Sequence, residues 1–224
     1  YRVAVQEKQP EWLYQWERFK DTEAFLFWDW IYPRTVEDFR GKRVLDAGCG
    51  PGHHMRLVAD VAQEVVGMDL NTAELAKQLL ANVPNASFIE DDLALHNAPD
   101  AYDVVYSIGV IDHTDSPDAS FENLKNMTAP GGLTMVWVWS HEGNGMMINL
   151  IEPLRAALLK DRSRAQIDQL AHFLTAVLYP IVHTIYRLPL TFLPYYDYFR
   201  NFRKLSFHRN ALNVFDKLNA PYTE

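Results

Sequence analysis

Residues 43–52 read Arg-Val-Leu-Asp-Ala-Gly-Cys-Gly-Pro-Gly. Val44 and Leu45 continue a short apolar run, which predicts a buried strand that ends at Asp46. Glycines at positions 48, 50 and 52 then predict a turn, and a helix is expected to begin near His53. Such a turn can bind an anionic group, because the backbone approaches closely and the first helical N–H groups have no intrahelical partner.

Two kinds of ligand use a turn of this type. A dinucleotide-binding turn, Gly-x-Gly-x-x-Gly, would need its third glycine at position 53, where this chain has His53. The carboxylate of Asp46 would also repel a pyrophosphate, whereas it would attract an ammonium or sulfonium group. S-adenosylmethionine carries both of these cations and a carboxylate, so the sequence favours it over a nicotinamide dinucleotide.

Residues 44–52 resemble motif I of the class I S-adenosylmethionine-dependent methyltransferases, which typically reads apolar-apolar-Asp-x-Gly-x-Gly-x-Gly. Looser similarities to one set of these enzymes extend over almost the whole chain, from Gln15-Trp16-Glu17-Arg18-Phe19 to Val214-Phe215-Asp216. The resemblance implies methyl transfer with S-adenosylmethionine as cofactor. The cofactor-binding residues that we expect are Asp46, Gly48, Cys49, Gly50, Gly52, Asp69, Leu70, Asp92, Leu93 and Ile108.

Besides Asp46, two of these residues are aspartates: Asp69 at the end of the second predicted strand and Asp92 just after the third. Asp69 lies 21 residues after Gly48, where an acidic side chain can accept hydrogen bonds from both ribose hydroxyls of an adenosine ligand. A helix N-cap is the structural alternative for Asp69. Asp92, followed by Leu93, matches the family's adenine-binding position better than Asp91 does.

His113 is the candidate catalytic residue. It follows the fourth predicted strand in the stretch Tyr106-Ser-Ile-Gly-Val-Ile-Asp-His-Thr114, and Asp112 stands where the family commonly has a first histidine. His113 could act as a general base, because its ordinary pKa of about 6.5 lies near working pH. A structural role beneath the methionine part of the cofactor stays open. The eight histidines are scattered, so no metal site is predicted.

Alternating apolar strands and helices predict an α/β fold: a Rossmann-like, doubly wound parallel sheet, for which the resemblance implies the strand order 3-2-1-4-5. The elements expected in it are strands at 43–46, 64–69, 86–90, 102–108 and 133–139, helices at 53–61, 73–82 and 117–128, and a turn at 129–132. The final antiparallel strands of a methyltransferase sheet are absent after Trp139, so we expect the native polypeptide to continue beyond Glu224.

Helical segments flank this sheet on both sides in the sequence. The predicted domains are an N-terminal helical cap over 1–40, a cofactor-binding domain over 41–140 and a helical insertion or lid over 141–224. In the insertion, we expect helices at 145–160 with a break at Pro153, at 163–187 behind a capping box, and at 209–219.

Composition narrows the partners. The chain has 224 residues and 48% hydrophobic residues, which is typical of a globular protein. Its net charge of −8 argues against a general nucleic-acid binder. Cys49 is its one cysteine, so no intrachain disulfide can form, and a cytoplasmic location is expected.

The acceptor is expected to be a small or medium-sized molecule, and an anionic acceptor with an apolar part is one alternative. Residues 169–186 contain no Asp, Glu, Lys or Arg, which favours a buried lid helix, with peripheral membrane contact as the alternative. A basic cluster follows, which is either a solvated helix face or a site for the acceptor's phosphate or carboxylate: Arg200, Arg203, Lys204, His208 and Arg209.

Two other functions remain open on the sequence alone. The first is a non-catalytic subunit that binds S-adenosylmethionine, and the second, disfavoured by His53 and Asp46, is a nicotinamide-dependent oxidoreductase. If the protein transfers methyl groups, alignment of the reactants and exclusion of water should supply much of the rate, because an in-line displacement needs little covalent help.

Overall fold

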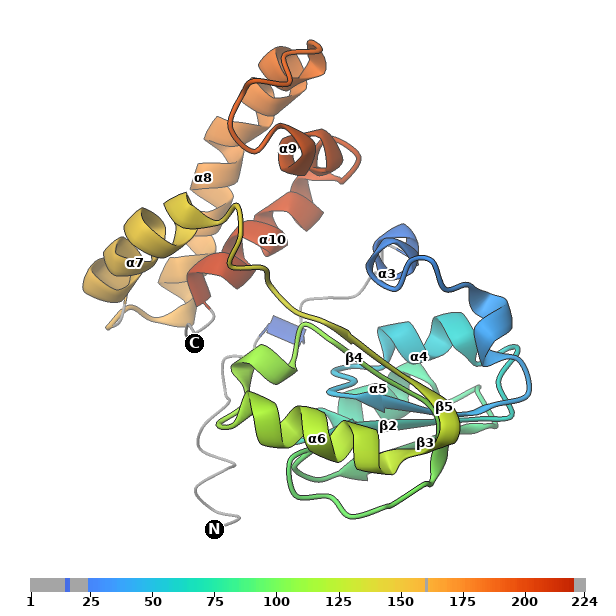
Figure 1. The fold of residues 1–224 in the computed structure, drawn as a ribbon. Coiled ribbons are helices and arrows are strands. Elements are labelled where there is room, and N and C mark those ends of the chain that lie inside the picture. The colour runs from blue at the N-terminus through green and yellow to red at the C-terminus, as the bar shows by residue number, and fades with distance from the viewer. Residues whose placement is uncertain (1–14, 17–23, 160, 220–224) are drawn as a thin grey trace. The chain divides into compact units, whose positions relative to one another are not determined.

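The computed structural model describes residues 15–16, 24–159 and 161–219 of the chain (Figure 1). The described residues form two compact units, a first unit that ends at His141 and a second unit that begins at Glu142. Residues 1–14 and 17–23 of the predicted cap lie outside the described residues.

The first unit is built on a parallel sheet. Its five strands run in the order β3-β2-β1-β4-β5, and every neighbouring pair is parallel. This order confirms the predicted Rossmann-like α/β fold. The strands are β1 (Arg43–Ala47), β2 (Glu64–Asp69), β3 (Ala86–Glu90), β4 (Tyr102–Ile108) and β5 (Thr128–Trp137).

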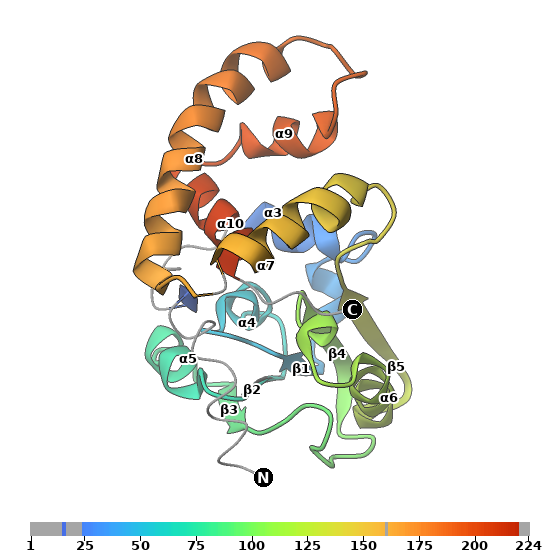
Figure 2. The same ribbon diagram turned by 90° about the vertical axis from the view of Figure 1, so that its left-hand side faces the viewer.

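Helices cover both faces of the sheet, because successive residues of the central strands point to opposite faces. Val44 packs with the hydrophobic cluster that includes Phe27 and Met55, whereas Leu45 packs with the cluster that includes Leu124. Figure 2 shows the sheet from a second side, with the helices around it. These helices are α3 (Ala24–Trp30), η1 (Val36–Phe39), α4 (His53–Val58), α5 (Ala73–Leu79), η2 (Ile111–His113) and α6 (Pro117–Met127).

The structure corrects the prediction at the start and end of β5. Thr128 pairs with Tyr102, and Leu133 pairs with Val104. The chain therefore advances by five residues along β5 while it advances by two along β4. The expected turn at 129–132 is therefore a bulge inside the strand, where Gly131 has a φ of +75°. Pairing ends at Trp137, two residues before the predicted end. In the described residues, no strand follows β5.

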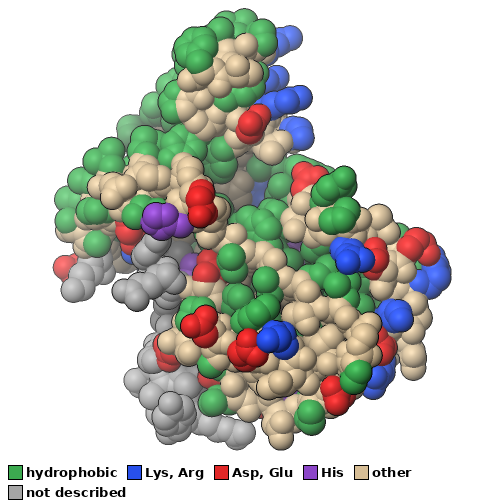
Figure 3. Space-filling model, in the orientation of Figure 1, with side chains coloured by type: hydrophobic (Ala, Val, Ile, Leu, Met, Phe, Trp, Pro, Cys, Tyr) green, Lys and Arg blue, Asp and Glu red, His purple; other side chains and the backbone are tan. Residues whose placement is uncertain are grey.

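The second unit is helical, and hydrophobic side chains gather on the face of it that Figure 3 shows. The predicted capping box is confirmed: the Ser163 N–H donates to Gln166 Oε1, and the Gln166 N–H donates to Ser163 Oγ. The break expected at Pro153 is a π-turn immediately before α7, where proline's missing N–H disturbs the regular bonding. Its helices are η3 (Met147–Ile151), α7 (Glu152–Leu159), α8 (Arg164–Thr184), η4 (Ile185–Arg187), α9 (Tyr196–Phe202) and α10 (Phe207–Asn219).

Within the second unit, α8 packs against α10. Its buried residues are Ile167, Ala171, Thr175 and Val182, and those of α10 include Ala211, Leu212 and Phe215. The charge-free run 169–186 lies within α8 and the start of η4. Of the helices in the described residues, none combines the length and the apolar character that crossing a membrane requires.

A buried carboxyl group lies beneath the glycine turn. Asp46, the fourth residue of β1, is 1% exposed, and its Oδ2 accepts a hydrogen bond of 3.0 Å from the hydroxyl of Tyr106 on β4. Burial raises the pKa of Asp46 to about 8, and the nearby charge of Asp69 adds to this rise, whereas the bond from Tyr106 opposes it. The folded protein therefore favours the neutral carboxylic acid at position 46.

This raised pKa makes the stability of the protein depend on pH. The folded state keeps a proton that the unfolded state releases above its pKa of 3.8, so stability is lost as pH rises toward about 8. Asp46→Asn cannot ionise and should remove this loss. Its free energy of unfolding, relative to wild type, should rise between about pH 5 and about pH 8 in urea denaturation.

The matched control is Asp60→Asn, which changes an exposed aspartate of the same unit. Its difference from wild type should stay constant over this range. A constant difference for Asp46→Asn as well would contradict the raised pKa.

Candidate functional site

The glycine turn between β1 and α4 needs the backbone conformations that glycine adopts readily. Gly48 and Gly50 have φ values of +81° and +52°. A Cβ at Gly48 would lie 2.4 Å from Cγ1 of Val110, and one at Gly50 would lie 3.1 Å from Cε2 of Trp16. A side chain at Gly48 therefore has no room, and one at Gly50 would press on the indole of Trp16.

Four hydrogen bonds fix this turn to the end of β2 and the start of α5. The backbone N–H groups of Gly48 and Cys49 donate to the carbonyl oxygen of Met68 at 2.7 and 3.0 Å. The Gly50 N–H donates to Oδ2 of Asp69 at 2.9 Å, and the buried Thr72 hydroxyl donates to the Gly50 carbonyl at 2.7 Å. The N–H and the carbonyl group of Gly50 are therefore both hydrogen-bonded, which holds the turn in place.

Asp69 thus supports the turn as well as standing beside it. Its second oxygen, Oδ1, accepts a bond of 3.3 Å from the Asn71 N–H. This bond to a backbone N–H is of the kind that a helix-capping residue makes. A carboxylate has about four lone-pair positions, so Asp69 can still accept hydrogen bonds from a ligand. Asp69 also faces a cavity.

The cavity has a volume of about 290 Å³, close to the lower end of small-molecule sites. It lies in the first unit, where the carboxyl ends of β2, β3 and β4 meet, as ligand sites do in open α/β sheets. The residues that line it are Trp16, Gly48, Met68, Asp69, Leu70, Asp91, Asp92, Leu93, Ala94, Leu95, Gly109, Val110, His113, Thr114, Asp115, Ser116 and Ala119.

The structure brings six of the expected site residues together at this cavity: Gly48, Asp69, Leu70, Asp92, Leu93 and His113. The other five do not line it. Asp46 and Cys49 are buried behind the turn, and burial raises the pKa of the Cys49 thiol well above its ordinary value. Gly50 faces Asp69, Gly52 caps α4, and Ile108 packs against the hydrophobic core.

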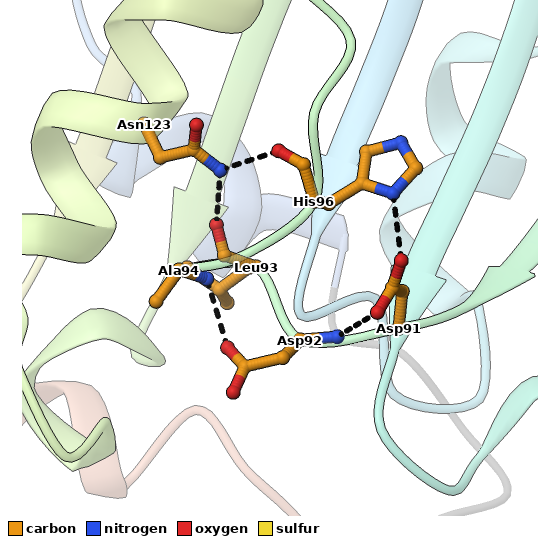
Figure 4. A network of polar contacts seen from close by, with 6 residues as sticks. All are labelled: Asp91, Asp92, Leu93, Ala94, His96 and Asn123. Carbon is orange, nitrogen blue, oxygen red and sulfur yellow. Dashed lines mark hydrogen bonds and ion pairs between the residues drawn. The ribbon is translucent and has the colours of Figure 1, made fainter. Parts of the chain in front are cut away.

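A hydrogen-bond network shapes the wall that follows β3 (Figure 4). Asp91 Oδ2 lies 2.9 Å from His96 Nδ1, and its Oδ1 accepts from the Asp92 N–H. Asp92 Oδ1 accepts from the Ala94 N–H at 2.8 Å, and the other oxygen of Asp92 carries no contact in Figure 4. Asp91, which the sequence ranks behind Asp92, therefore orders the loop that presents Asp92.

Asn123 of α6 completes this network. Its Nδ2 donates to the backbone carbonyls of Leu93 and His96, at 2.7 Å each (Figure 4). Sequence reasoning missed Asn123, and it also missed Trp16 as a wall of the cavity. The local sequence does not predict either contact. Asn123 lies about thirty residues from Leu93, and Trp16 lies still farther from most of the residues with which it lines the cavity.

His113 ends η2 beside the cavity. Its Nε2 lies 3.9 Å from Oδ2 of Asp112, and its backbone N–H donates to the Val110 carbonyl at 2.9 Å. The Thr114 hydroxyl caps the same short helix by donating to the Ile111 carbonyl. The imidazole is therefore held on an ordered turn at the edge of the cavity.

The charge of the cavity wall has one sign in the part of the chain that is described. Four of its residues are aspartates, at positions 69, 91, 92 and 115, and none of the described lining residues is Lys or Arg. Such a wall attracts a cationic ligand and disfavours an additional anionic group. Within the described residues, no group of three or more His, Cys, Asp or Glu is arranged to hold a metal ion.

Several known methyltransferases are similar to this chain. The family model of the methyltransferase domain matches residues 20–176. The chain is 36% identical over 120 residues to a tRNA U34 carboxymethyltransferase of Klebsiella pneumoniae, covering 50% of this chain and 36% of that protein. It is 33% identical over 137 residues to the protein of that name in Pseudomonas paraeruginosa, covering 57% of this chain and 42% of that one.

Among solved structures, an S-adenosylmethionine-dependent methyltransferase from Mesorhizobium loti is similar, with a TM-score of 0.40 and 24% identity over 44% of this chain and 47% of that chain. The chain spans well under half the length of the curated relatives that it matches. Because the methyltransferase-domain model matches more than half of the chain, the chain belongs to the class I S-adenosylmethionine-dependent methyltransferase family.

Proposed function

We propose that this protein transfers a methyl group from S-adenosylmethionine to a small or medium-sized acceptor. The observation that carries the proposal is the cavity at the ends of β2, β3 and β4, where acidic side chains adjoin a glycine turn. A cationic sulfonium compound matches this wall in charge, and an adenosine matches its hydrogen-bond acceptors.

Each part of the cofactor has a place in this proposal. Asp69 accepts the ribose hydroxyls while it keeps its bonds to the turn, since its carboxylate has lone pairs to spare. Asp92 accepts from the adenine amino group with the oxygen that Ala94 leaves unused, and Leu93 packs on the ring. The methionine part lies between Gly48 and His113.

The proposed reaction is an in-line displacement at the methyl carbon, with a neutral thioether as leaving group. Its rate comes mainly from alignment and from a dry cavity, because charge disperses in the transition state when the acceptor is an anion. His113 acts as a base only for an acceptor that arrives protonated. An enclosing role for the cap and the helical insertion stays a prediction.

The relatives' names raise two alternatives, a carboxymethyl donor and a tRNA acceptor. A carboxymethyl donor would bring a second carboxylate toward four aspartates, with no Lys or Arg among the described lining residues to offset it. This charge pattern favours the methyl donor. The net charge of −8 favours an acceptor smaller than tRNA. A tRNA acceptor is the alternative.

Asp69→Ala should weaken S-adenosylmethionine binding by about 1.5–3 kcal/mol, roughly 10- to 100-fold, because a charged acceptor loses its hydroxyl partners. Isothermal titration measures this loss. Asp60→Ala, which removes an exposed carboxylate from the same unit, is the matched control and should bind normally.

Because Asp69 also holds the turn, a second ligand separates its two roles. An S-adenosylhomocysteine analogue without the two ribose hydroxyls should bind wild type and Asp69→Ala with similar affinity, since the interaction is absent in both pairs. An equal loss for the analogue and for the parent compound would mean that Asp69 acts only through the turn.

Turnover is tested by incubating the protein with S-adenosylmethionine and a panel of lipophilic carboxylates, phenols and tRNA. We expect S-adenosylhomocysteine to form together with a product heavier by one methylene unit. His113→Gln should lower turnover only modestly, whereas an obligatory base would cost about a hundredfold. Tight cofactor binding without any turnover would favour the non-catalytic subunit. Turnover that occurs only when a carboxymethyl sulfonium compound replaces S-adenosylmethionine, and that gives a carboxymethylated product, would contradict the choice of donor.

A further inference from the structure

The charges of the chain are divided unevenly between the two units. Residues 142–221 contain ten Lys or Arg and six Asp or Glu, a formal charge of +4, while the remaining residues contain eleven and twenty-three, a formal charge of −12. Between Asp168 and Asp216 the one acidic residue is Asp197. A partner of the second unit is therefore expected to be anionic.

A row of large apolar side chains is exposed along α8 and its end. The row is formed by Phe173, Val177, Ile181, Ile185 and Leu188, of which Phe173 is 64% and Leu188 53% exposed. Spacings of four residues place Phe173, Val177 and Ile181 on one face of α8, and Ile185 and Leu188 follow in η4 and at its end. The residues by which α8 packs within its unit are different ones, so the exposed row is not needed for that packing.

The loop after η4 exposes a further large apolar side chain. Phe192 in this loop is 80% exposed. The loop is held by the Tyr186 hydroxyl, which donates to the Pro194 carbonyl, and by the Tyr196 hydroxyl, which donates to the Leu188 carbonyl, both at 3.1 Å. Phe192 adds to the large apolar side chains that the α8 row exposes, and large exposed apolar patches mark interaction sites.

Basic side chains lie at the same end of the second unit, near the end of α8. Arg187 adjoins Leu188 in the sequence, and Arg200 and Lys204 are exposed on and just after α9. Arg203 ties α9 to the same end of α8, because its Nη1 donates to the Tyr186 carbonyl at 3.0 Å. Figure 3 shows hydrophobic and basic side chains next to one another on the upper part of the second unit.

We infer that the end of the second unit docks on a membrane surface that contains anionic phospholipids. Leu188 and Phe192 enter the acyl region, the α8 row lies along the interface, and Arg187, Arg200 and Lys204 contact the headgroup phosphates. Apolar burial and electrostatic attraction act together here, since each alone gives weak, reversible binding. This inference goes beyond the proposed function and does not depend on the cofactor site.

The chemistry of the row favours lipid over nucleic acid. Single-stranded nucleic acids stack their bases on aromatic rings. Four of the five residues of the α8 row are aliphatic instead: Val177, Ile181, Ile185 and Leu188. Aliphatic side chains gain free energy when acyl chains replace water around them. The basic side chains at this end of the unit match phosphate headgroups.

The test is flotation of the full chain with phosphatidylcholine vesicles and with vesicles that also contain phosphatidylserine. Binding is expected to the mixed vesicles, to be weaker for phosphatidylcholine alone, and to fall with added salt. Phe192→Ser combined with Leu188→Ser should lower the affinity roughly tenfold or more. Arg200→Glu combined with Lys204→Glu should remove the preference for phosphatidylserine.

Matched controls make these results specific. Leu158→Ser changes a leucine of α7 that is 64% exposed but lies outside the row, and Lys77→Glu reverses an exposed charge in the first unit. Both should bind vesicles like wild type. Circular dichroism checks that every variant is folded, whatever the outcome of the cofactor experiments.

Three outcomes would overturn the inference. The first is no binding to the mixed vesicles, as expected if the row is covered by other residues of the same chain. The second is binding that the Phe192 and Leu188 changes do not weaken. The third is binding of a tRNA probe by the second unit's basic residues in the absence of vesicle binding.

Discussion

Hydrogen bonds from the end of β2 and the start of α5 hold the glycine turn in place, and the candidate site depends on them. Asp69 accepts the Gly50 N–H, and Thr72 donates to the Gly50 carbonyl, so one peptide segment is fixed from both directions. Because Asp69 also faces the cavity, the residue proposed to bind the ribose is the residue that positions the turn. In this proposal, cofactor binding and the local conformation are coupled through a single carboxylate.

Much of the sheet was predictable from the sequence because its central strands β1, β2 and β4 are mostly buried apolar runs, and β3 is a short strand between turns. The bounds of β2, β3 and β4 match the prediction, since each strand is a short run between turn-forming or polar residues. The start of β5 was not predictable. Ala-Pro-Gly-Gly is typical of a turn, and only the pairing with β4 converts it into a bulge. The register of two strands depends on both of them, so the sequence of β5 alone does not predict it.

The site was predictable where residues follow strands, and unpredictable where tertiary packing decides. Asp69 and Asp92 face the cavity because parallel strands end at one edge of a sheet. Asp46 was expected to meet the cofactor's cations, yet it is buried against Tyr106 behind the turn, at a depth that only the packing of β4 determines. Asn123 lies on a helix about thirty residues beyond the loop that it holds. Its role follows from the fold rather than from any motif.

The central claim is that the cavity beside the glycine turn is an S-adenosylmethionine site organised by Asp69. A crystal structure of the protein with S-adenosylhomocysteine tests it most directly. The account predicts both ribose hydroxyls within hydrogen-bonding distance of the Asp69 carboxylate, the adenine beside Asp92 and Leu93, and the Gly50 N–H still bonded to Asp69. A nucleoside bound elsewhere, or one whose ribose leaves Asp69 untouched, would contradict it.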